Sequence, residues 1–253
     1  MRRVWSIVCY EFKMQIRRRA AWGLLLAVLS ISLSDSFPSA GNLARLEFLS
    51  VPDYFIYRTI GVYGLIMAMG LMFLVSNCIP ADEKAGVKPL MMAAPVRKWQ
   101  YITGKLTAAA VFSFTMLSVF LLLNQFIYFI AVPVKPAVPE MLLCFCRAEI
   151  VSIVPISVFV GFSAASFPAL TDIRLFYLLA GLLFVFNASC VNHAEGSPFY
   201  LITSGNLLRC IWVHPKYPQI DYAGVWANLL FLLAGGFGSW ALLTAKRRFW
   251  RSE

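Results

Sequence analysis

Cysteine and histidine side chains are the most reactive groups in this sequence, and their spacing suggests only one covalent link. Cys190 and Cys210 bracket a long polar and aromatic segment, so a disulfide between them would close a loop of about 20 residues. Cys144 and Cys146 are closer together than the usual zinc spacing, and no second pair is positioned to complete a site. Both histidines lie in the segment between Cys190 and Tyr222. We therefore expect no metal site, and we leave the disulfide open.

Catalytic motifs are absent from the sequence. The chain has no glycine-rich phosphate loop ending in Gly-Lys-Ser/Thr and no His-Glu-x-x-His zinc motif. It also has no Gly-x-Ser-x-Gly nucleophile turn. An intramembrane protease or acyltransferase would lack the residues that its chemistry needs. The sequence predicts a protein that is not an enzyme by itself and that holds no cofactor of its own.

The segment from Asp82 to Leu106 is polar, although it lies between two long apolar runs. Acidic and basic residues begin it, apolar residues follow at helical spacing, and Pro95 ends that turn. A second helix starts near Tyr101. A short amphipathic helix between two membrane spans can lie along the membrane surface or bind a partner protein. An ordinary charged loop is the alternative.

The elements that position this segment are strongly apolar. Hydrophobic residues make up 60% of the 253 residues and charged residues 13%, with a mean hydropathy of +0.74. Soluble domains have about 45–50% apolar and about 25% charged residues. The predicted fold class is therefore an all-α integral membrane protein with six transmembrane helices, forming one domain over residues 1–253. The predicted spans cover about 20–37, 59–81, 106–132, 148–170, 175–190 and 223–245.

Basic residues give the spans an orientation. Sixteen of the 22 Lys and Arg residues fall on one side of the membrane when both termini are placed in the cytoplasm. The net charge of +10 is then explained by topology and by anionic lipids, and no nucleic-acid partner is expected. The acidic and basic residues within or beside the spans fall near span ends, namely Asp35, Arg58, Arg147, Glu149 and Asp172. Carriers driven by protons or ions usually keep ionisable residues near the membrane centre. Because this chain has none there, we expect a separate protein to supply the energy for its activity.

Residues 1–19 are predicted to form an interfacial helix on the cytoplasmic leaflet. Apolar and basic residues are mixed over this segment, Trp5 is among them, and a basic cluster ends it. No small-x-small cleavage site precedes a soluble domain, so a cleaved signal is not expected. The charged residues that characterise the helix are Glu11, Lys13, Arg17, Arg18 and Arg19.

The Asp82–Leu106 segment resembles the coupling segment of the ABC-2 type transporter permeases, which are transmembrane subunits of ATP-binding cassette (ABC) transporters. In that family an acidic-basic pair precedes an apolar helix, an Ala-Pro-Val-Arg-like turn, an aromatic residue and a Gly-Lys-Leu sequence that opens the next span. The corresponding residues here are Glu83, Lys84, Leu90, Met91, Ala94, Pro95, Val96, Arg97 and Tyr101, followed by Gly104, Lys105 and Leu106. The interfacial helix, the six spans and the long outer connection before the last span are compatible with the same family.

The resemblance implies a permease subunit that exports an amphipathic or hydrophobic cargo, such as a peptide, drug or lipid. A cytoplasmic coupling helix between spans 2 and 3 would bind a separate ABC ATPase subunit, which holds ATP and Mg and hydrolyses the ATP. A second permease chain, the same or related, would pair with this one among the membrane lipids of a bacterial cell (cytoplasmic) membrane. The alternative is a non-transporting scaffold or sensor subunit with the same six-helix body.

Overall fold

The computed structural model describes residues 2–46, 48–86, 96–189, 200–201, 210–212 and 222–246. Within these residues every regular element is a helix, which confirms the predicted all-α class. The elements in chain order are α1 (Arg2–Ile16), α2 (Arg19–Ser36), α3 (Ala40–Arg45), α4 (Pro52–Arg58), the π-helix η1 (Thr59–Gly64), α5 (Leu65–Ser76), α6 (Cys78–Lys84), α8 (Lys98–Ala131), α9 (Val138–Ala148), the π-helix η2 (Glu149–Ile153), α10 (Val154–Leu170), α11 (Ile173–Ser189) and α13 (Tyr222–Ala245).

Four helical runs in the described part of the chain are long and apolar enough to cross a membrane. They are Pro52–Asp82, Lys98–Ala131, Val138–Leu170 and Tyr222–Ala245. Helix α11 is apolar but shorter, and α2 fills the first of the six predicted spans. All six apolar runs seen in the sequence are therefore helical, and the four long ones are consistent with a multi-pass membrane protein.

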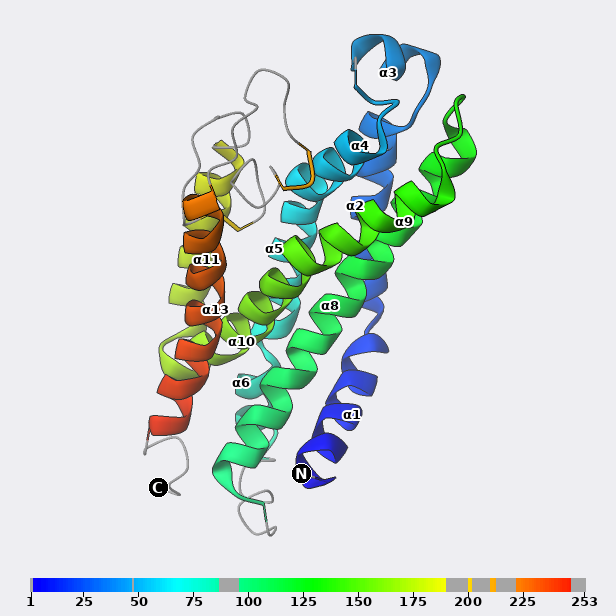
Figure 1. Ribbon diagram of the computed structural model, residues 1–253. Helices are drawn as coiled ribbons and strands as arrows, with labels where there is room; N and C mark the ends of the chain where they lie inside the picture. The colour runs from blue at the N-terminus through cyan, green and yellow to red at the C-terminus, as the bar shows by residue number, and fades with distance from the viewer. Residues whose placement is uncertain are drawn as a thin grey trace.

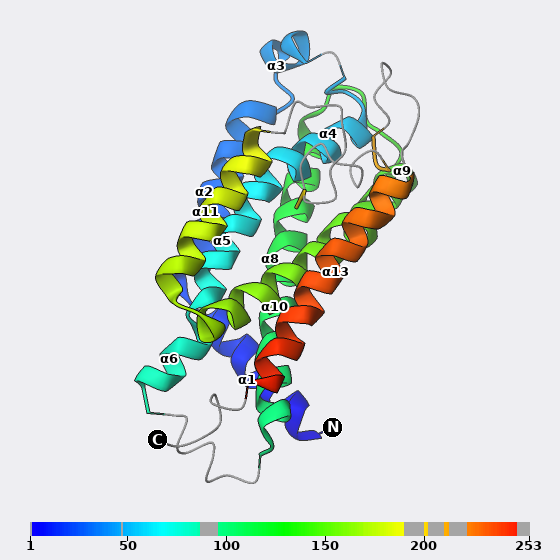
Figure 2. The same cartoon turned by 90° about the vertical axis from the view of Figure 1, so that its left-hand side faces the viewer.

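The helices form an elongated bundle with two distinct ends (Figures 1 and 2). Helix α1, α6 and the first turns of α8 lie at one end, which we call the basal end. Helices α3 and α4 lie at the opposite end, which we call the distal end. Helix α10 runs obliquely across the bundle and packs against α8, α13, α5, α11 and α6 (Figure 1). It is the element that holds the other long helices together.

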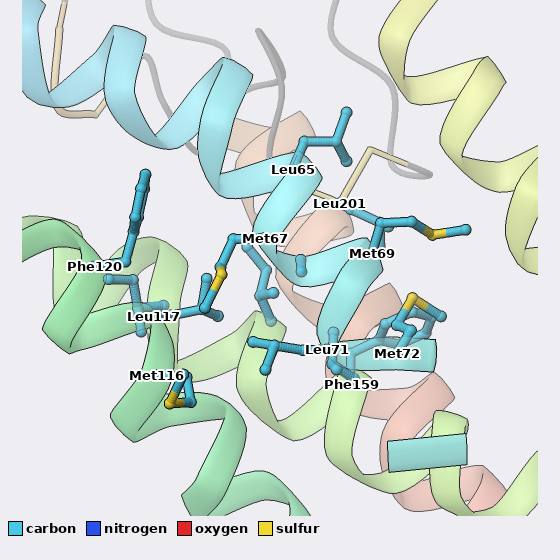
Figure 3. Close-up of a cluster of buried hydrophobic side chains, with 14 of the residues drawn as sticks. Leu65, Met67, Met69, Leu71, Met72, Met116, Leu117, Phe120, Phe159 and Leu201 are labelled. Carbon is cyan, nitrogen blue, oxygen red and sulfur yellow. The ribbon is translucent and has the colours of Figure 1, made fainter. Parts of the chain in front are cut away.

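The hydrophobic core lies where α5, α8 and α10 meet. Met67, Leu71, Met116 and Leu117 are almost completely buried there, and Figure 3 shows them gathered with neighbouring leucine, methionine and phenylalanine side chains. Methionine is common on α5, and its flexible thioether fills irregular gaps between helices. The core therefore packs three helices without requiring a regular repeat along any of them.

The helical run Val138–Leu170 is continuous, although Pro155 lies within it. Pro155 has no backbone N–H, and its ring clashes with the carbonyl four residues earlier in a regular α-helix. The turn before it, Glu149–Ile153, widens into the π-helix η2, and Pro155 then occupies the first turn of α10. The proline thus changes the local winding of the helix without ending it.

Two lysine side chains tie helix ends together at the basal end. Lys98 Nζ donates hydrogen bonds of 2.7 Å each to the carbonyls of Thr244 and Lys246 at the end of α13. Lys246 Nζ donates to the carbonyls of Ala169 and Leu170 at the end of α10, at 3.1 and 3.0 Å. Because the last carbonyls of a helix have no partner within it, these ammonium groups stabilise both ends. The start of α8 is thereby joined to α13, and α13 to α10.

The contact of α10 with α8 predicts a strong effect at Gly161. A Cβ atom added there would lie 2.3 Å from the backbone nitrogen of Ala110, so the two helices would have to separate. We expect Gly161→Ala to lower the free energy of unfolding by about 3 kcal/mol, the upper end of typical overpacking costs. Thermal unfolding of the purified protein in detergent measures this.

Gly181 in α11 provides the control, because an added Cβ there meets no atom within 4 Å. Gly181→Ala should leave the unfolding midpoint unchanged or raise it, since alanine favours a helix over glycine by about 1 kcal/mol. Equal midpoints for the two variants would contradict the close approach of α8 and α10.

Candidate functional site

A cluster of ionised side chains is buried at the basal end, where α1, α6 and α8 meet. Lys105 of α8 is 1% exposed, and its Nζ lies 3.0 Å from Glu11 Oε1 and 2.5 Å from Asp82 Oδ2. The same nitrogen donates to the carbonyl of Cys78 at 3.2 Å. Tyr101 donates its hydroxyl hydrogen to Asp82 Oδ2 at 2.5 Å. We call Glu11, Asp82, Tyr101 and Lys105 the basal ionic cluster.

The cluster satisfies the lysine completely but leaves an excess of negative charge. A lysine ammonium has three N–H donors, and the three acceptors around Lys105 match them. Two carboxylates face one ammonium, so the formal charge of the cluster is −1. A buried ion pair contributes little net stability compared with apolar packing, but removing one partner leaves a charge with no compensation. The cluster therefore fixes how the three helices are positioned more than it adds stability.

Helical spacing and one glycine bring these groups together. Tyr101 and Lys105 are four residues apart on α8, and Cys78 and Asp82 are four apart on α6, so each pair lies on one helix face. Gly104 lets α1 approach α8 closely, because a Cβ atom there would lie 2.7 Å from Ile7 Cγ2. The absence of a side chain at Gly104 allows Glu11 to reach Lys105.

Polar atoms without partners surround the cluster on the α1 side. Glu11 Oε2 is buried and accepts no hydrogen bond from the described residues. The Gln15 amide is also buried, and within the same residues its Nε2 has no acceptor and its Oε1 no donor. Gln15 lies one turn after Glu11 on the buried face of α1. A cavity of about 380 Å³ adjoins this region, and Glu11, Asp82 and Tyr101 all contribute to its wall. Buried polar atoms usually have partners, so this combination marks the region as a candidate binding site.

The residues predicted for ATPase coupling are spread along the chain from the end of α6 to the first turn of α8. Leu90, Met91, Ala94 and Pro95 lie outside the described residues. Glu83 belongs to the last turn of α6 and Lys84, its last residue, is exposed. Val96 and Arg97 directly precede α8, with Arg97 exposed and its N–H bonded to Gln100 Oε1 at 3.0 Å. Tyr101 is only 5% exposed, so its hydroxyl acts inside the basal ionic cluster and not on an outer surface.

The residues predicted for the interfacial helix separate into two groups. Lys13, Arg17 and Arg19 are exposed, as expected of a helix that lies against lipid headgroups. Arg18 is half-buried and donates from Nη1 to the Leu74 carbonyl at 3.3 Å, and Glu11 is buried in the basal ionic cluster. The buried face of α1 is therefore partly polar, in contrast to a simple amphipathic helix.

The predicted disulfide is not tested by the structure. Cys190 lies outside the described residues, whereas Cys210 is partly buried within a short described segment. Burial raises the pKa of the Cys210 thiol, because the thiolate loses hydration. The pairing of Cys190 with Cys210 stays a prediction.

An apolar cavity of about 410 Å³ lies on the other side of the bundle, between α5, α10, α11 and α13. Met72 and Phe159, both visible in Figure 3, contribute to its wall. The rest of the wall is also almost entirely apolar and comes from Ser163, Phe167, Leu170, Phe176, Leu179, Ala180, Leu183, Ala234, Gly235, Gly238, Ser239 and Leu242. A cavity of this size and character fits a small hydrophobic molecule or a lipid chain.

Glu149 is an acidic residue within the apolar helical run Val138–Leu170, where it contacts α8. Its Oε2 accepts a hydrogen bond from Ser118 Oγ at 3.0 Å, and its Oε1 is buried without a partner among the described residues. The helix that carries Glu149 begins at Val138, whereas the predicted span begins near residue 148. The position of Glu149 relative to the end of the span stays a prediction.

Aspartate and arginine residues form a second polar cluster at the distal end. Asp35 pairs with Arg45, at 2.6 Å, and with Arg58, and it also accepts a hydrogen bond from Tyr63. Its side chain is about one-third exposed, so each pair contributes little stability. This cluster joins the end of α2 to α3, α4 and η1, and we assign it a structural role.

Sequence reasoning missed the basal ionic cluster, although one signal was available. Lys105 follows the polar segment at the point where a long apolar helix begins, and a lysine at that position needs a nearby anion. The partners themselves could not be identified, because Glu11 and Asp82 are distant in sequence and many charged residues compete for the role.

The cluster predicts that Lys105 cannot be replaced by an apolar residue of similar size. Lys105→Met should lower the free energy of unfolding by about 3–5 kcal/mol, because Glu11 and Asp82 would stay buried without a cation. Adding Glu11→Gln and Asp82→Asn to this variant should recover much of the loss, since no unpaired charge then remains. Thermal unfolding in detergent compares the two variants.

Lys13→Met is the matched control, because Lys13 is exposed on the same helix as Glu11. It should leave the unfolding midpoint within about 1 °C of wild type, as most surface substitutions have small effects. A Lys105→Met variant as stable as the control would show that the buried ion pairs do not determine the packing of α1.

Comparisons with known proteins identify no relative of this chain. No protein-family model matches it, no curated protein is detectably similar in sequence, and no solved structure is detectably similar in fold. The functional assignment therefore rests on the sequence pattern and on the geometry of the described residues.

Proposed function

We propose that this chain is the transmembrane permease subunit of an ABC-2 type ATP-binding cassette transporter. It exports an amphipathic or hydrophobic cargo, and a separate ATPase subunit supplies the energy of ATP hydrolysis. The chain crosses the cytoplasmic membrane of a bacterium six times, with α2 and α11 as the shorter spans and both termini in the cytoplasm. A second permease chain, the same or related, completes the transport unit.

The observation that carries the proposal is the attachment of the coupling segment to the basal ionic cluster. Residues 87–95 connect α6 to α8, and the segment resembles the coupling element of the family. Asp82 lies just before this connection and Tyr101 just after it, and both belong to the cluster that also holds Glu11 of α1. A displacement of the connection would therefore be transmitted to three helices together.

The apolar cavity supports the proposed class of cargo. Its wall is almost entirely apolar, so a hydrophobic molecule would lose little hydration there and would gain contacts with Phe159 and Phe176. A strongly polar cargo would find few hydrogen-bond partners in the same space. Three of the helices around the cavity, α10, α11 and α13, would belong to the transport pathway.

Binding of an ATPase tests the proposal most directly. In the proposed complex Leu90 inserts into an apolar cleft of the ATPase, so Leu90→Asp would bury an unpaired carboxylate at a cost of several kcal/mol (about 3–5). We expect this variant to lose ATPase co-purification and cargo-stimulated hydrolysis. Arg97→Ala should have a milder effect that grows with salt concentration, because Arg97 would contribute a contact at the rim.

Leu90→Met is the matched control and should retain both activities, since it conserves volume and hydrophobicity. Full association and full stimulated turnover of Leu90→Asp would refute the coupling role. A chain that binds an ATPase but never moves cargo into or out of vesicles would favour the scaffold or sensor alternative.

The cavity gives a second test of the same proposal. Gly238 contributes to the cavity wall, and an added Cβ there meets no atom within 4 Å, so a leucine side chain would fill the space without disturbing the helices. Gly238→Leu should raise the cargo concentration needed for half-maximal stimulation of ATP hydrolysis by about tenfold or more. Gly181→Leu, on α11 but not part of the cavity wall, should leave it unchanged. Equal cargo responses in the two variants would show that cargo does not enter this cavity.

A further inference from the structure

The cavity beside the basal ionic cluster has a wall that combines the acidic residues Glu11 and Asp82 with apolar, hydroxyl and aromatic side chains. Ser6, Ile7, Tyr10, Glu11 and Met14 of α1 form one side, and Asp82 and Tyr101 form the other. The Glu11 side chain is 9% exposed, and its Oε2 has no hydrogen-bond partner among the described residues. Glu11 thus contributes to the wall of a cavity of about 380 Å³ and has a buried carboxylate oxygen without a donor, which indicates a missing donor.

The charge of the cluster indicates that the missing donor is a cation. Glu11 and Asp82 carry two negative charges, and Lys105 supplies one positive charge. Arg18, which follows α1, donates to the Leu74 carbonyl. The only ion pair of Glu11 among the described residues is the one with Lys105. One additional positive charge beside Glu11 would make the cluster neutral, and a low-dielectric site strongly favours that.

The remaining wall determines what kind of cation fits. Ile7 and Met14 are apolar, and Tyr10 adds an aromatic ring, which attracts cations through its π-electrons. The described residues hold no group of three His, Cys, Asp or Glu side chains that could bind a metal ion. We propose that this cavity binds a primary ammonium group attached to an apolar chain, with the ammonium donating to Glu11 Oε2 and the chain lying against Ile7 and Met14.

Two kinds of molecule carry a primary ammonium group on an apolar chain and could occupy the cavity. One is a free amphipathic amine from solution, and the other is the ethanolamine headgroup of a membrane lipid next to α1. Both present a primary ammonium group, and they differ in whether the lipid composition determines occupancy. The inference does not depend on the proposed transport function, because it requires only the geometry of α1, α6 and α8.

Calorimetric titration of the full chain in lipid nanodiscs tests the inference, with hexylammonium as the probe. In discs of phosphatidylcholine and phosphatidylglycerol we expect saturable binding to wild type. Glu11→Gln should weaken it about tenfold or more, because a neutral amide replaces a charge-assisted hydrogen bond. Ser6→Phe should also weaken it, because the larger side chain would fill the cavity without changing a carboxylate. The neutral analogue hexanol should bind at least tenfold more weakly than hexylammonium.

The control variant is Glu140→Gln, which removes an exposed carboxylate outside the cavity and should bind hexylammonium like wild type. Repeating the titration in discs that contain phosphatidylethanolamine identifies the source: weaker apparent binding means that the lipid headgroup competes, and unchanged binding means that free amines are preferred. Absence of saturable binding, equal binding of hexanol, or unchanged binding in both Glu11→Gln and Ser6→Phe would overturn the inference.

Discussion

The burial of Lys105 is the constraint on which the base of this structure depends. A lysine ammonium that is 1% exposed requires acceptors on every side, and the chain supplies them from α1 and α6. Neither helix is held there by apolar contacts alone: the buried face of α1 includes Glu11 and Gln15, and α6 is only seven residues long. Because a partly satisfied ionic cluster costs more than an apolar one, the three helices have one favourable arrangement and few alternatives.

The stiffness of this base contrasts with the looser packing near α11 and α13. Helix α8 extends from the basal ionic cluster through the core, and Gly161 allows α10 to cross it at backbone contact distance. From that crossing α10 reaches α11 and α13, and the apolar cavity lies among them. Gly235 and Gly238 place little side-chain volume on the α13 side of the cavity. The same long helices thus form a rigid contact on one side and an open apolar space on the other.

The sequence alone predicted the positions of the helices, which depend on local hydropathy. It did not predict the sites that form where residues distant in sequence come together. The six apolar runs are helical within a few residues of the expected bounds at most ends, because hydropathy over about 20 residues determines them. The helical run to Leu170 begins at Val138, before the predicted span, because the amphipathic stretch Val138–Ala148 looks like a connection in the sequence but forms a helix. The basal ionic cluster and both cavities were not predicted, since each depends on side chains from three or more helices.

The basal hydrogen bonds suggest how a movement of residues 87–95 would reach the apolar cavity. Lys98 begins α8 immediately after the connection, and its ammonium group holds the last carbonyls of α13. Lys246 at the end of α13 holds the last carbonyls of α10. Helices α13 and α10 form much of the cavity wall, so a shift of the first turn of α8 would move two sides of the cavity through only two ammonium groups. Each of these hydrogen bonds has a charged donor and contributes about 1.5–3 kcal/mol, less than the cost of about 3–5 kcal/mol for removing one partner of the buried ion pairs of Lys105. In the proposed transporter, the connection would therefore move the cavity wall while the basal ionic cluster keeps α1, α6 and α8 together.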